Sequence, residues 1–557
     1  MIPANDPVKR CVIFLFYDKD GIADEYVIHM LEDVRKDSQY VLAVVNGLLT
    51  EDSRSRLLQV TDDLVVHPNV GMDVGGYREG LFYIGFKRLA EFDEVILMNY
   101  TFFGPLYPFH EMFLEMNKRD LDFWGITCHQ NDEKDPFGTL PFGFLPKHIN
   151  SHFIAMRQNF FTSFYYKNYI FNLPNPETYQ DSITKYEVIF TKYFADRGFK
   201  WGVYADTSEF EGICSAPYMY EIQEMIPKKR CPIIKRRSFF ADYTVMLENN
   251  CGESSQEAYR AIKEKTDYDT GMIWDNILRL QNLADIRQAM HFTYFLPTEG
   301  TAHPAFRTRE AGVFIFGEKE KFHALLRRYE QALPENWRTE YFEGGEPYKE
   351  KILRAGRTAG ETEYTLILNL SDLTAGEEPY SNGASLLYRD LENTAATSDF
   401  IGNVLDEFEN EKALGMLVPP VPGFGRYFKE VGNGWAGQFD NVKKALNALG
   451  LAVPVIPGTA RPMAPYGGSF WIRTELLRKL AELPLAELPV SGLTFRFLLP
   501  YLMQHFRRLT GIVMNCDYAA IEITNQDYKF RINNQTAFAK FGPDLYEPEI
   551  RRIRGLM

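Results

Sequence analysis

Residues 67–81 read HPNVGMDVGGYREGL, and the fold of the first half of the chain depends on how this stretch is interpreted. It continues the apolar run DLVVHPN (63–69), which has the pattern of a buried strand, and leads into GYREGLFYIGFKRL (76–89), which has helical spacing. A tight turn needs only one or two glycines. The four glycines here therefore suggest that something other than a side chain approaches the backbone.

The segments around this stretch alternate between strand and helix patterns. Predicted strands lie at 11–17, 40–46, 63–69 and 93–100, and predicted helices at 23–37, 51–60 and 76–89. This order predicts an α/β fold in which helices cover both faces of a mainly parallel sheet. Ligands of such sheets bind beyond the carboxyl ends of the strands, which is where 69–76 falls.

The same plan begins again at residue 311. Strand and helix patterns alternate there as well, at 311–317, 319–333, 339–342, 348–358 and 363–370. Later landmarks also recur, because strands at 121–127 and 151–157 and a helix at 183–198 have parallels at 414–420, 468–480 and 494–507. The repeat predicts two modules of one architecture. We expect a first domain at 1–243, a helical connector at 244–300 and a second domain at 301–557.

Composition narrows the functional classes. A formal net charge of −14 argues against a nucleic-acid-binding protein, which needs a basic surface. The 6 cysteines form no CxxC pair, which indicates a reducing compartment and no zinc site. No apolar run approaches the roughly 18 residues of a membrane span, and the amino terminus lacks a signal peptide. We expect a cytoplasmic protein whose contact with a membrane, if it has one, is peripheral.

The glycine-rich stretch offers groups suited to a nucleotide. Backbone N–H groups at Gly75 and Gly76 lie where the predicted helix begins, and a helix amino terminus favours an anion. Asp73 could accept a hydrogen bond from a ribose hydroxyl or from N3–H of uracil or thymine. The alternative is an ordinary strand-to-helix turn with a capping aspartate. The pattern is not GxGxxG, so no dinucleotide cofactor is indicated.

The fourth predicted strand ends in ILMNYTFFGP (96–105). Many sugar-nucleotide enzymes place two carboxylates there to hold a divalent cation on the diphosphate. Asn99 and Thr101 occupy the positions here and are poor ligands, so a bound Mg²⁺ or Mn²⁺ is disfavoured and no cofactor is obligatory. Positive charge could come instead from KKRCPIIKRR (228–237), although charge runs are commonly only solvated surface.

Further candidates come from the later elements. Glu187, in the first turn of the predicted helix 183–198, could accept the proton of an acceptor hydroxyl, or it could be a surface glutamate. His148 and His152 flank a predicted strand and could equally be capping or core histidines. No Ser/His/Asp motif, P-loop or HExxH occurs.

Several blocks together resemble the rhamnan synthesis protein F family of bacterial glycosyltransferases, which build rhamnose-containing polysaccharide or lipopolysaccharide O-antigen chains. The blocks are FLFYDKDGIADEYV, NVGMDVGGYREGL, EVILMNYTFFGPLYPF, HINSHFIAMR, YEVIFTKYFADRGFKW and KRCPIIKRRSFF, with ALGMLVPP, PYGGSFWIRTELL and DYAAI in the second half. The resemblance implies two modules of the GT-A type, the fold of nucleotide-diphosphosugar transferases. It implies a donor such as dTDP-L-rhamnose and a lipid-linked saccharide acceptor at the inner face of the plasma membrane.

The resemblance also implies roles for individual residues. Glu187 matches the base of inverting GT-A enzymes, and a β-linked donor giving an α-rhamnoside would require inversion. His152 is a candidate for the acceptor or sugar. The candidates for the nucleotide sugar are Asp18, Asn69, Gly71, Asp73, Gly75, Asn99, Thr101, Lys235, Arg236 and Arg237.

The second module departs from the family pattern. Ser491 stands where the family has aspartate, Arg496 falls where Glu187 lies in the first module, and NVGMD has no counterpart between 339 and 348. We therefore expect a non-catalytic second module that positions the acceptor or a partner. The rival interpretation of the whole chain is a non-catalytic scaffold of a polysaccharide assembly complex. Retention of Glu187 and the basic segment favours the enzyme.

Overall fold

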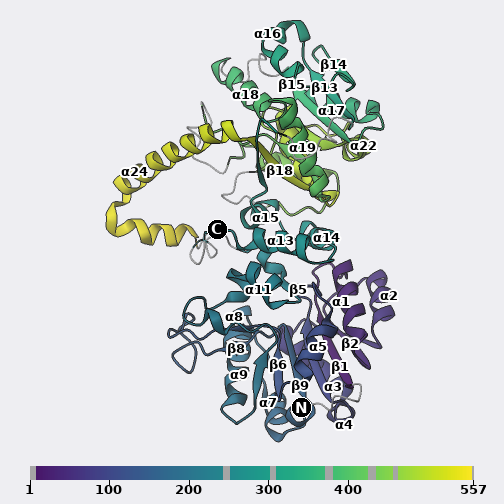
Figure 1. Ribbon diagram of the computed structural model, residues 1–557, viewed down its shortest axis with the longest axis vertical. Coiled ribbons are helices and arrows are strands. Elements are labelled where there is room, and N and C mark those ends of the chain that lie inside the picture. Colours follow the sequence, from purple (N-terminus) through teal and green to yellow (C-terminus); the bar gives the residue numbers. More distant parts are fainter. Residues whose placement is uncertain are drawn as a thin grey trace. The chain divides into compact units, whose positions relative to one another are not determined.

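The chain divides into two compact units, Met1–Asn276 and Ile277–Met557 (Figure 1). The computed structural model describes residues 8–241, 247, 251–300, 309–370, 380–424, 434–455 and 462–554. The described residues of the predicted connector form three helices and one short strand, and the boundary between the units falls within the second of these helices, α14 (Gly271–Leu280). The predicted domain limits at 243 and 301 stay predictions.

The first unit is built on a seven-stranded sheet with the order β10-β6-β9-β4-β1-β2-β3 among its described strands. Neighbouring strands run parallel except β9, which is antiparallel to both β4 and β6. Two small sheets, β5 with β11 and β7 with β8, lie beside it. The strands are β1 (Arg10–Phe16), β2 (Tyr40–Asn46), β3 (Asp63–His67), β4 (Glu94–Asn99), β5 (Phe102–Phe103), β6 (Phe123–Gly125), β7 (Cys128–His129), β8 (His148–Ile149), β9 (Phe153–Arg157), β10 (Trp201–Val203) and β11 (Ile234–Lys235).

Helices cover both faces of this sheet, as the alternation predicts. Cys11, Ile13 and Leu15 of β1 join α3 and α9 in one core, while β6 and β9 pack Trp124 and Phe153 against α5. The helices are α1 (Glu25–Arg35), α2 (Glu51–Val60), α3 (Met72–Ile84), α4 (Phe86–Leu89), α5 (Phe109–Asn117), α6 (Gln158–Phe161), α7 (Phe164–Asn172), α8 (Tyr179–Ser182), α9 (Val188–Ala195), α10 (Pro217–Tyr220), α11 (Ile222–Lys229) and α13 (Ser254–Lys265).

The glycine-rich stretch is mostly helix and not turn. Helix α3 begins at Met72, earlier than predicted, after Gly71 in the left-handed conformation (φ 77°). A Cβ on Gly75 would lie 2.1 Å from the carbonyl oxygen of Val70, and one on Gly76 would lie 2.2 Å from Cδ1 of Leu15. These glycines therefore let α3 pack closely on its own entry turn and on β1. Close packing is therefore enough to explain the number of glycines, and a ligand is not needed for it.

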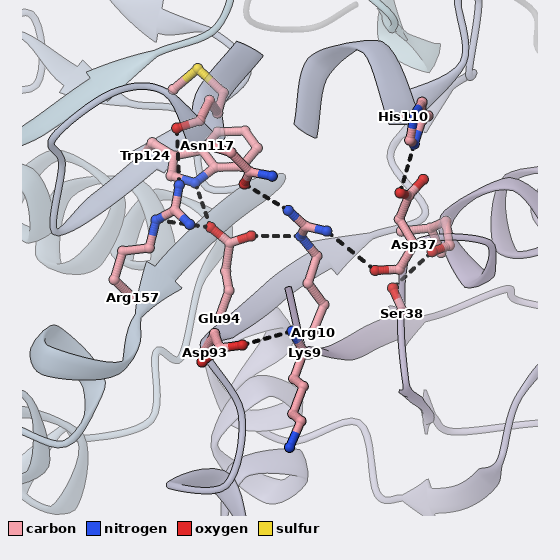
Figure 2. Close-up of polar contacts among 12 residues, drawn as sticks. Lys9, Arg10, Asp37, Ser38, Asp93, Glu94, His110, Asn117, Trp124 and Arg157 are labelled. Atoms are coloured by element: carbon pink, nitrogen blue, oxygen red, sulfur yellow. Dashed lines mark hydrogen bonds and ion pairs between the residues drawn. The ribbon is translucent and has the colours of Figure 1, made fainter. Parts of the chain in front are cut away.

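A buried ionic network ties the sheet together at the end opposite this turn (Figure 2). The Glu94 carboxylate, fully buried, accepts hydrogen bonds from Arg10 Nε (2.8 Å) and Trp124 Nε1 (2.7 Å), and Arg157 Nε lies 3.3 Å away. Arg10 also donates to the Asn117 side chain at 2.8 Å. A buried carboxylate is tolerated only when it is paired in this way, so the network defines the register of β1, β4 and β9.

The second unit repeats this topology. Its described strands form a seven-stranded sheet with the order β12-β18-β16-β17-β15-β13-β14, and β17 is antiparallel to both neighbours, as β9 is in the first unit. In the described part of this unit no strand corresponds to β3, and β12 lies at the opposite edge. The strands are β12 (Thr293–Leu296), β13 (Ala311–Phe316), β14 (Thr339–Phe342), β15 (Tyr364–Asn369), β16 (Leu414–Val418), β17 (Phe470–Arg473) and β18 (Leu509–Asn515).

The remaining helices belong to this unit or contain its boundary. They are α14, α15 (Leu283–Met290), α16 (Lys319–Glu330), α17 (Tyr348–Thr358), α18 (Tyr380–Glu392), α19 (Ser398–Asn410), α21 (Phe439–Ala448), α22 (Thr474–Glu482), α23 (Gly492–His505) and α24 (Cys516–Arg554), drawn in yellow in Figure 1. Over the described residues, none of the helices combines the length and the apolar character needed to cross a bilayer.

Candidate active site in the first unit

Polar side chains gather at the carboxyl ends of the strands in the first unit. Asn99, the last residue of β4, donates from Nδ2 to Oδ2 of Asp73 in the first turn of α3, at 2.8 Å. Its other side-chain atom, Oδ1, accepts from the backbone N–H (3.1 Å) and the hydroxyl (2.7 Å) of Thr101. The structure therefore brings together three residues that the sequence predicted at this end of the sheet.

The basic segment joins this cluster through the small β5–β11 sheet. Lys235 pairs with Phe102, and the Arg236 N–H donates to the Thr101 carbonyl at 3.0 Å. Burial lowers the pKa of Lys235, while the carboxylates of Glu187 and Asp73 raise it. The Lys235 ammonium thus lies within electrostatic range of two carboxylates that come from separate elements.

Asp73 has an unusual pKa for an aspartate. Burial raises the pKa of its carboxyl to about 6, and Glu187 adds to the rise, while Lys235 and the Asn99 hydrogen bond act in the opposite direction. Burial and a nearby second carboxylate both favour the protonated form of a carboxyl group. Asp73 is therefore more easily protonated than an ordinary aspartate.

Glu187 is positioned by an irregular helix. The Thr178–Asp181 capping box starts α8, a π-helical turn follows over Ile183–Glu187, and α9 begins at Val188. The prediction that Glu187 lies in the first turn of a helix is wrong, because the helix begins earlier, at the unrecognised T-x-x-D cap. The wider π turn places Glu187 beside the cluster, and such turns are frequent at functional sites.

The two oxygens of Glu187 have different neighbours. Oε2 accepts from the backbone N–H of Ser151 (3.0 Å) and from its hydroxyl, whereas Oε1 lies 3.9 Å from Nε2 of His148. Burial raises the pKa of Glu187, but His148, Lys235 and the Ser151 bonds outweigh it and the net shift is downward. Glu187 is consequently ionised at neutral pH, although only 19% of its side chain is exposed.

The other basic residues divide into two groups. Lys228, Lys229 and Arg230 form surface ion pairs with Glu224, Glu209 and Glu111. Arg236 is buried: its Nε donates to the Asn276 side chain at 2.9 Å, and its guanidinium lies 5.5 Å from each of two tyrosine ring centroids. Arg237 is exposed, 3.5 Å from the Tyr179 hydroxyl. Of the six basic residues in 228–237, Lys235 and Arg237 are therefore the two that could meet the charge of a ligand at the cluster.

The remaining predicted residues lie in differing surroundings. Asp18 accepts from the N–H groups of Asp20 (2.9 Å) and Ile22 (3.1 Å) and so shapes the turn after β1. Asn69 is exposed. The Gly75 N–H donates to the Gly71 carbonyl at 2.7 Å, so it is the groups before it, at Met72, Asp73 and Val74, that precede the first helical bond.

The two histidines of KHINSHF differ sharply. His152 is 1% exposed, lies against Phe102 and has a pKa well below its ordinary value because of burial. Its predicted contact with an acceptor stays untested, and its burial does not favour one. His148 contacts Glu187 instead. Three neighbours of Glu187 were not predicted, since no spacing motif links them to it: Ser151, which donates to it, and His129 and Tyr218, whose pKa values it raises.

The family follows from comparison with known sequences. The model of rhamnan synthesis protein F matches residues 41–311 and 352–492, most of the chain. The chain belongs to the rhamnan synthesis protein F family. This member is a glycosyltransferase of polysaccharide synthesis. No curated protein matches it.

Solved structures with partial likeness to this family member include three enzymes. A 4-diphosphocytidyl-2C-methyl-D-erythritol synthase from Anaerococcus prevotii is 11% identical, with TM-score 0.24, over 35% of this chain and 86% of its own. Core-mannan synthase A from Aspergillus fumigatus, in its Mn/GDP form, is 12% identical, with TM-score 0.19, over 30% and 64%. Mouse xyloside xylosyltransferase 1 is 10% identical, with TM-score 0.20, over 41% and 97%. At these scores none bears on activity.

In the second unit of this glycosyltransferase, other side chains occupy the place that corresponds to the Glu187 site. Arg157 pairs with Glu94 in the first sheet, and Arg473 pairs with Tyr364 at the equivalent position of the second sheet. Counted back along the chain from these two arginines, Ser151 and His152 correspond to Gly467 and Gly468. The Tyr348 hydroxyl donates to the Gly468 carbonyl at 2.8 Å, and the Arg496 guanidinium lies 4.7 Å from the Tyr348 ring centroid. A tyrosine and a buried arginine therefore occupy the region where the first unit has Glu187.

Proposed function

We propose that the first unit transfers a deoxyhexose, L-rhamnose from dTDP-L-rhamnose, to a lipid-linked saccharide with inversion. The observation that carries this proposal is the convergence of Asp73, Asn99, Lys235 and Glu187 at the carboxyl ends of the parallel strands. Family membership supports polysaccharide synthesis as the setting. The second unit, with Tyr348 and Arg496 in the equivalent region, would bind or position without catalysing.

The nucleotide would lie against the first turn of α3. The N–H groups of Met72, Asp73 and Val74 precede the first helical bond and favour an anion. The Asp73 carboxylate, held by Asn99, would accept a hydrogen bond from the ribose or from N3–H of the base. Above about pH 6 this carboxylate is ionised and able to accept.

Lys235 would take the part that a divalent cation plays in many related reactions. The oxygen of Asn99 already accepts two hydrogen bonds from Thr101, so it makes a poor metal ligand. Of the two carboxylates that interact with the Lys235 ammonium, Asp73 is the one bonded to Asn99. This donor set fits a diphosphate neutralised by an ammonium group better than a metal-bridged one. Divalent metal is therefore proposed to be dispensable.

Glu187 would be the general base. It is ionised at neutral pH, and its Oε2 is oriented by Ser151, which leaves Oε1 for the acceptor proton. In a single in-line displacement the acceptor oxygen attacks the anomeric carbon as its proton moves to Glu187. The bond between that carbon and the diphosphate oxygen breaks, and the diphosphate leaves with the electron pair.

The test is a screen of nucleotide sugars for turnover, with thermal-shift measurements in dTDP and UDP with and without EDTA. We expect stabilisation by at least one nucleotide that EDTA does not abolish, and turnover of a deoxyhexose donor. No shift with any nucleotide would overturn the donor site. Loss of the shift on adding EDTA would overturn the metal-free arrangement alone.

A further inference from the structure

A pair of stacked histidines adjoins Glu187, and the reaction proposed above leaves them without a role. His129 and His148 face each other across the two-stranded β7–β8 sheet, with ring centroids 5.3 Å apart and planes only 5° from parallel. His148 is 2% exposed. The sheet is fixed to α9, since the Ile149 N–H donates to the Thr191 hydroxyl at 3.0 Å. The rings are therefore held rigidly behind Glu187.

The backbone fixes which nitrogen of each ring carries hydrogen. Nδ1 of His148 lies 2.7 Å from the carbonyl oxygen of Pro146, and Nδ1 of His129 lies 2.8 Å from that of Gln130. A carbonyl can only accept, so both Nδ1 atoms donate. In the neutral ring, Nε2 of His148 is then an unprotonated acceptor, and it is this atom that lies 3.9 Å from Oε1 of Glu187.

We propose that Glu187 and His148 share one proton, so that His148 takes from Glu187 the proton removed from the acceptor hydroxyl and restores the carboxylate. This relay rests on the proposed role of Glu187 as base. Ser151 occupies Oε2, which directs the exchange to Oε1. The separation of 3.9 Å exceeds a hydrogen bond by about 1 Å, and catalytic contacts of this kind commonly tighten only when substrate is bound.

The proton and electrons balance at each step. The acceptor O–H bond breaks, its electron pair forms the new glycosidic bond, and the proton bonds to Oε1. That proton then moves to Nε2 of His148, which becomes an imidazolium, and is finally lost to water. Because His148 is buried, its charged imidazolium form is disfavoured, so the ring gives up this proton and returns to its neutral form.

The surroundings lower the pKa of both members of the pair. Burial lowers the pKa of His148 to about 4, with Glu187 raising it and His129 lowering it further. The pKa of Glu187 is also below its ordinary value. The titratable groups that interact electrostatically with Glu187 are Lys235 from β11, Asp73 and Tyr77 from α3, His148 from β8, His129 from β7 and Tyr218 from α10.

The first test needs no substrate. NMR of the full chain labelled with ¹⁵N-histidine, assigned with His148→Gln, should show His148 with hydrogen on Nδ1 at neutral pH. Its titration midpoint should fall in Glu187→Gln, which removes the anion, and rise in His129→Phe, which keeps a stacking ring without a second charge. At a fixed pH, the ¹⁵N chemical shifts of His110, which pairs with Asp37 on the surface, should be the same in both variants as in the wild type. Hydrogen on Nε2, or an unmoved midpoint in Glu187→Gln, would overturn the shared proton.

The second test follows turnover against pH. In His148→Gln we expect kcat to fall by about tenfold or more, with the donor KM unchanged. The acid limb of kcat should move to higher pH, because the group that lowers the pKa of Glu187 is gone. A merely structural role would lower the melting temperature and leave the limb in place, and that result would overturn the relay. Absence of turnover in the wild type with every donor would instead overturn the proposed function.

Discussion

The two units share a sheet topology but differ at both ends of it. At the carboxyl end, the first unit has Ser151 bonded to Glu187, whereas Gly467 and Tyr348 occupy the corresponding region of the second. At the amino end, Arg157 faces the Glu94 carboxylate, whereas Arg473 lies 5.7 Å from the ring centroid of Tyr364. The arginine is kept and its partner is replaced. The difference teaches that this topology survives replacement of the carboxylates Glu94 and Glu187, so activity must be argued from the site and not from the fold.

The strongest test of the comparison is Glu187→Gln. Loss of the base should lower transfer by about 10²–10⁴-fold, while binding of the nucleotide is unchanged because Glu187 does not hold it. Steady-state transfer and calorimetric nucleotide titration measure the two halves. The matched control is Glu177→Gln, because Glu177 is an exposed glutamate just before α8. This variant should behave as wild type. Weakened nucleotide binding in Glu187→Gln would remove Glu187 as a dedicated base.

The amino ends of the sheets should differ in their sensitivity to charge removal. Glu94→Ala leaves two arginines unpaired in the core and should lower the free energy of unfolding of the first unit by about 3–5 kcal/mol. Glu409→Ala in the second unit removes a partly exposed partner of Tyr364 and should cost only about 1 kcal/mol. Hydrogen exchange of β1 and β15 reports each unit separately. Equal losses would show that the network is not specific to the first unit.

Lys235→Ala tests whether an ammonium group replaces a metal. We expect transfer to fall by about 10²-fold, as for loss of one preorganised group that stabilises developing charge. Lys229→Ala, which breaks a surface ion pair with Glu209, should stay within twofold of wild type. Transfer is compared in EDTA and in Mn²⁺. Full rescue of Lys235→Ala by Mn²⁺ would support the proposal that the Lys235 ammonium group replaces a metal ion. Equal activities of Lys235→Ala and Lys229→Ala would contradict that proposal.

The smallest expected effect is a pH dependence of nucleotide binding. The pKa of Asp73 is raised to about 6, so its carboxylate is ionised above that pH and protonated below it. If the carboxylate accepts a hydrogen bond from the nucleotide, affinity should be constant at high pH and fall by about tenfold at pH 5. Titration calorimetry across this range measures it. Asp73→Asn should bind weakly at every pH, and a persisting pH dependence would assign the effect to another group.

Much of the fold follows from local patterns. The bounds of β2, α2, β14 and α17 agree with the sequence patterns, because their apolar periodicity is strong and their ends carry clear turn residues. The start of α3 was misplaced, since glycines favour a turn locally but here allow close packing on β1. Helix packing depends on residues far away in the sequence, which no local pattern records.

The candidate site was predictable only in part. Asp73, Asn99 and Thr101 follow from the rule that ligands lie beyond the carboxyl ends of parallel strands. Only β11 distinguishes Lys235 from the surface residue Lys229, and this two-residue strand is too short to produce a sequence pattern. The contact between Ser151 and Glu187 joins a loop to a π turn, and neither element has a sequence signature that identifies its partner.

The edges of the two sheets carry a consequence for how such a chain can change. At one edge, the first sheet ends with β3 and the second sheet ends with β14. At the opposite edge, the second sheet is extended by β12. An edge strand shares a hydrogen-bond ladder with one neighbour only, so its gain or loss leaves the centre intact. Because β3 leads into α3 and Asp73, removing this one peripheral strand also removes the proposed nucleotide contact. The proposed nucleotide contact thus depends on a strand at the margin of the sheet and not at its centre.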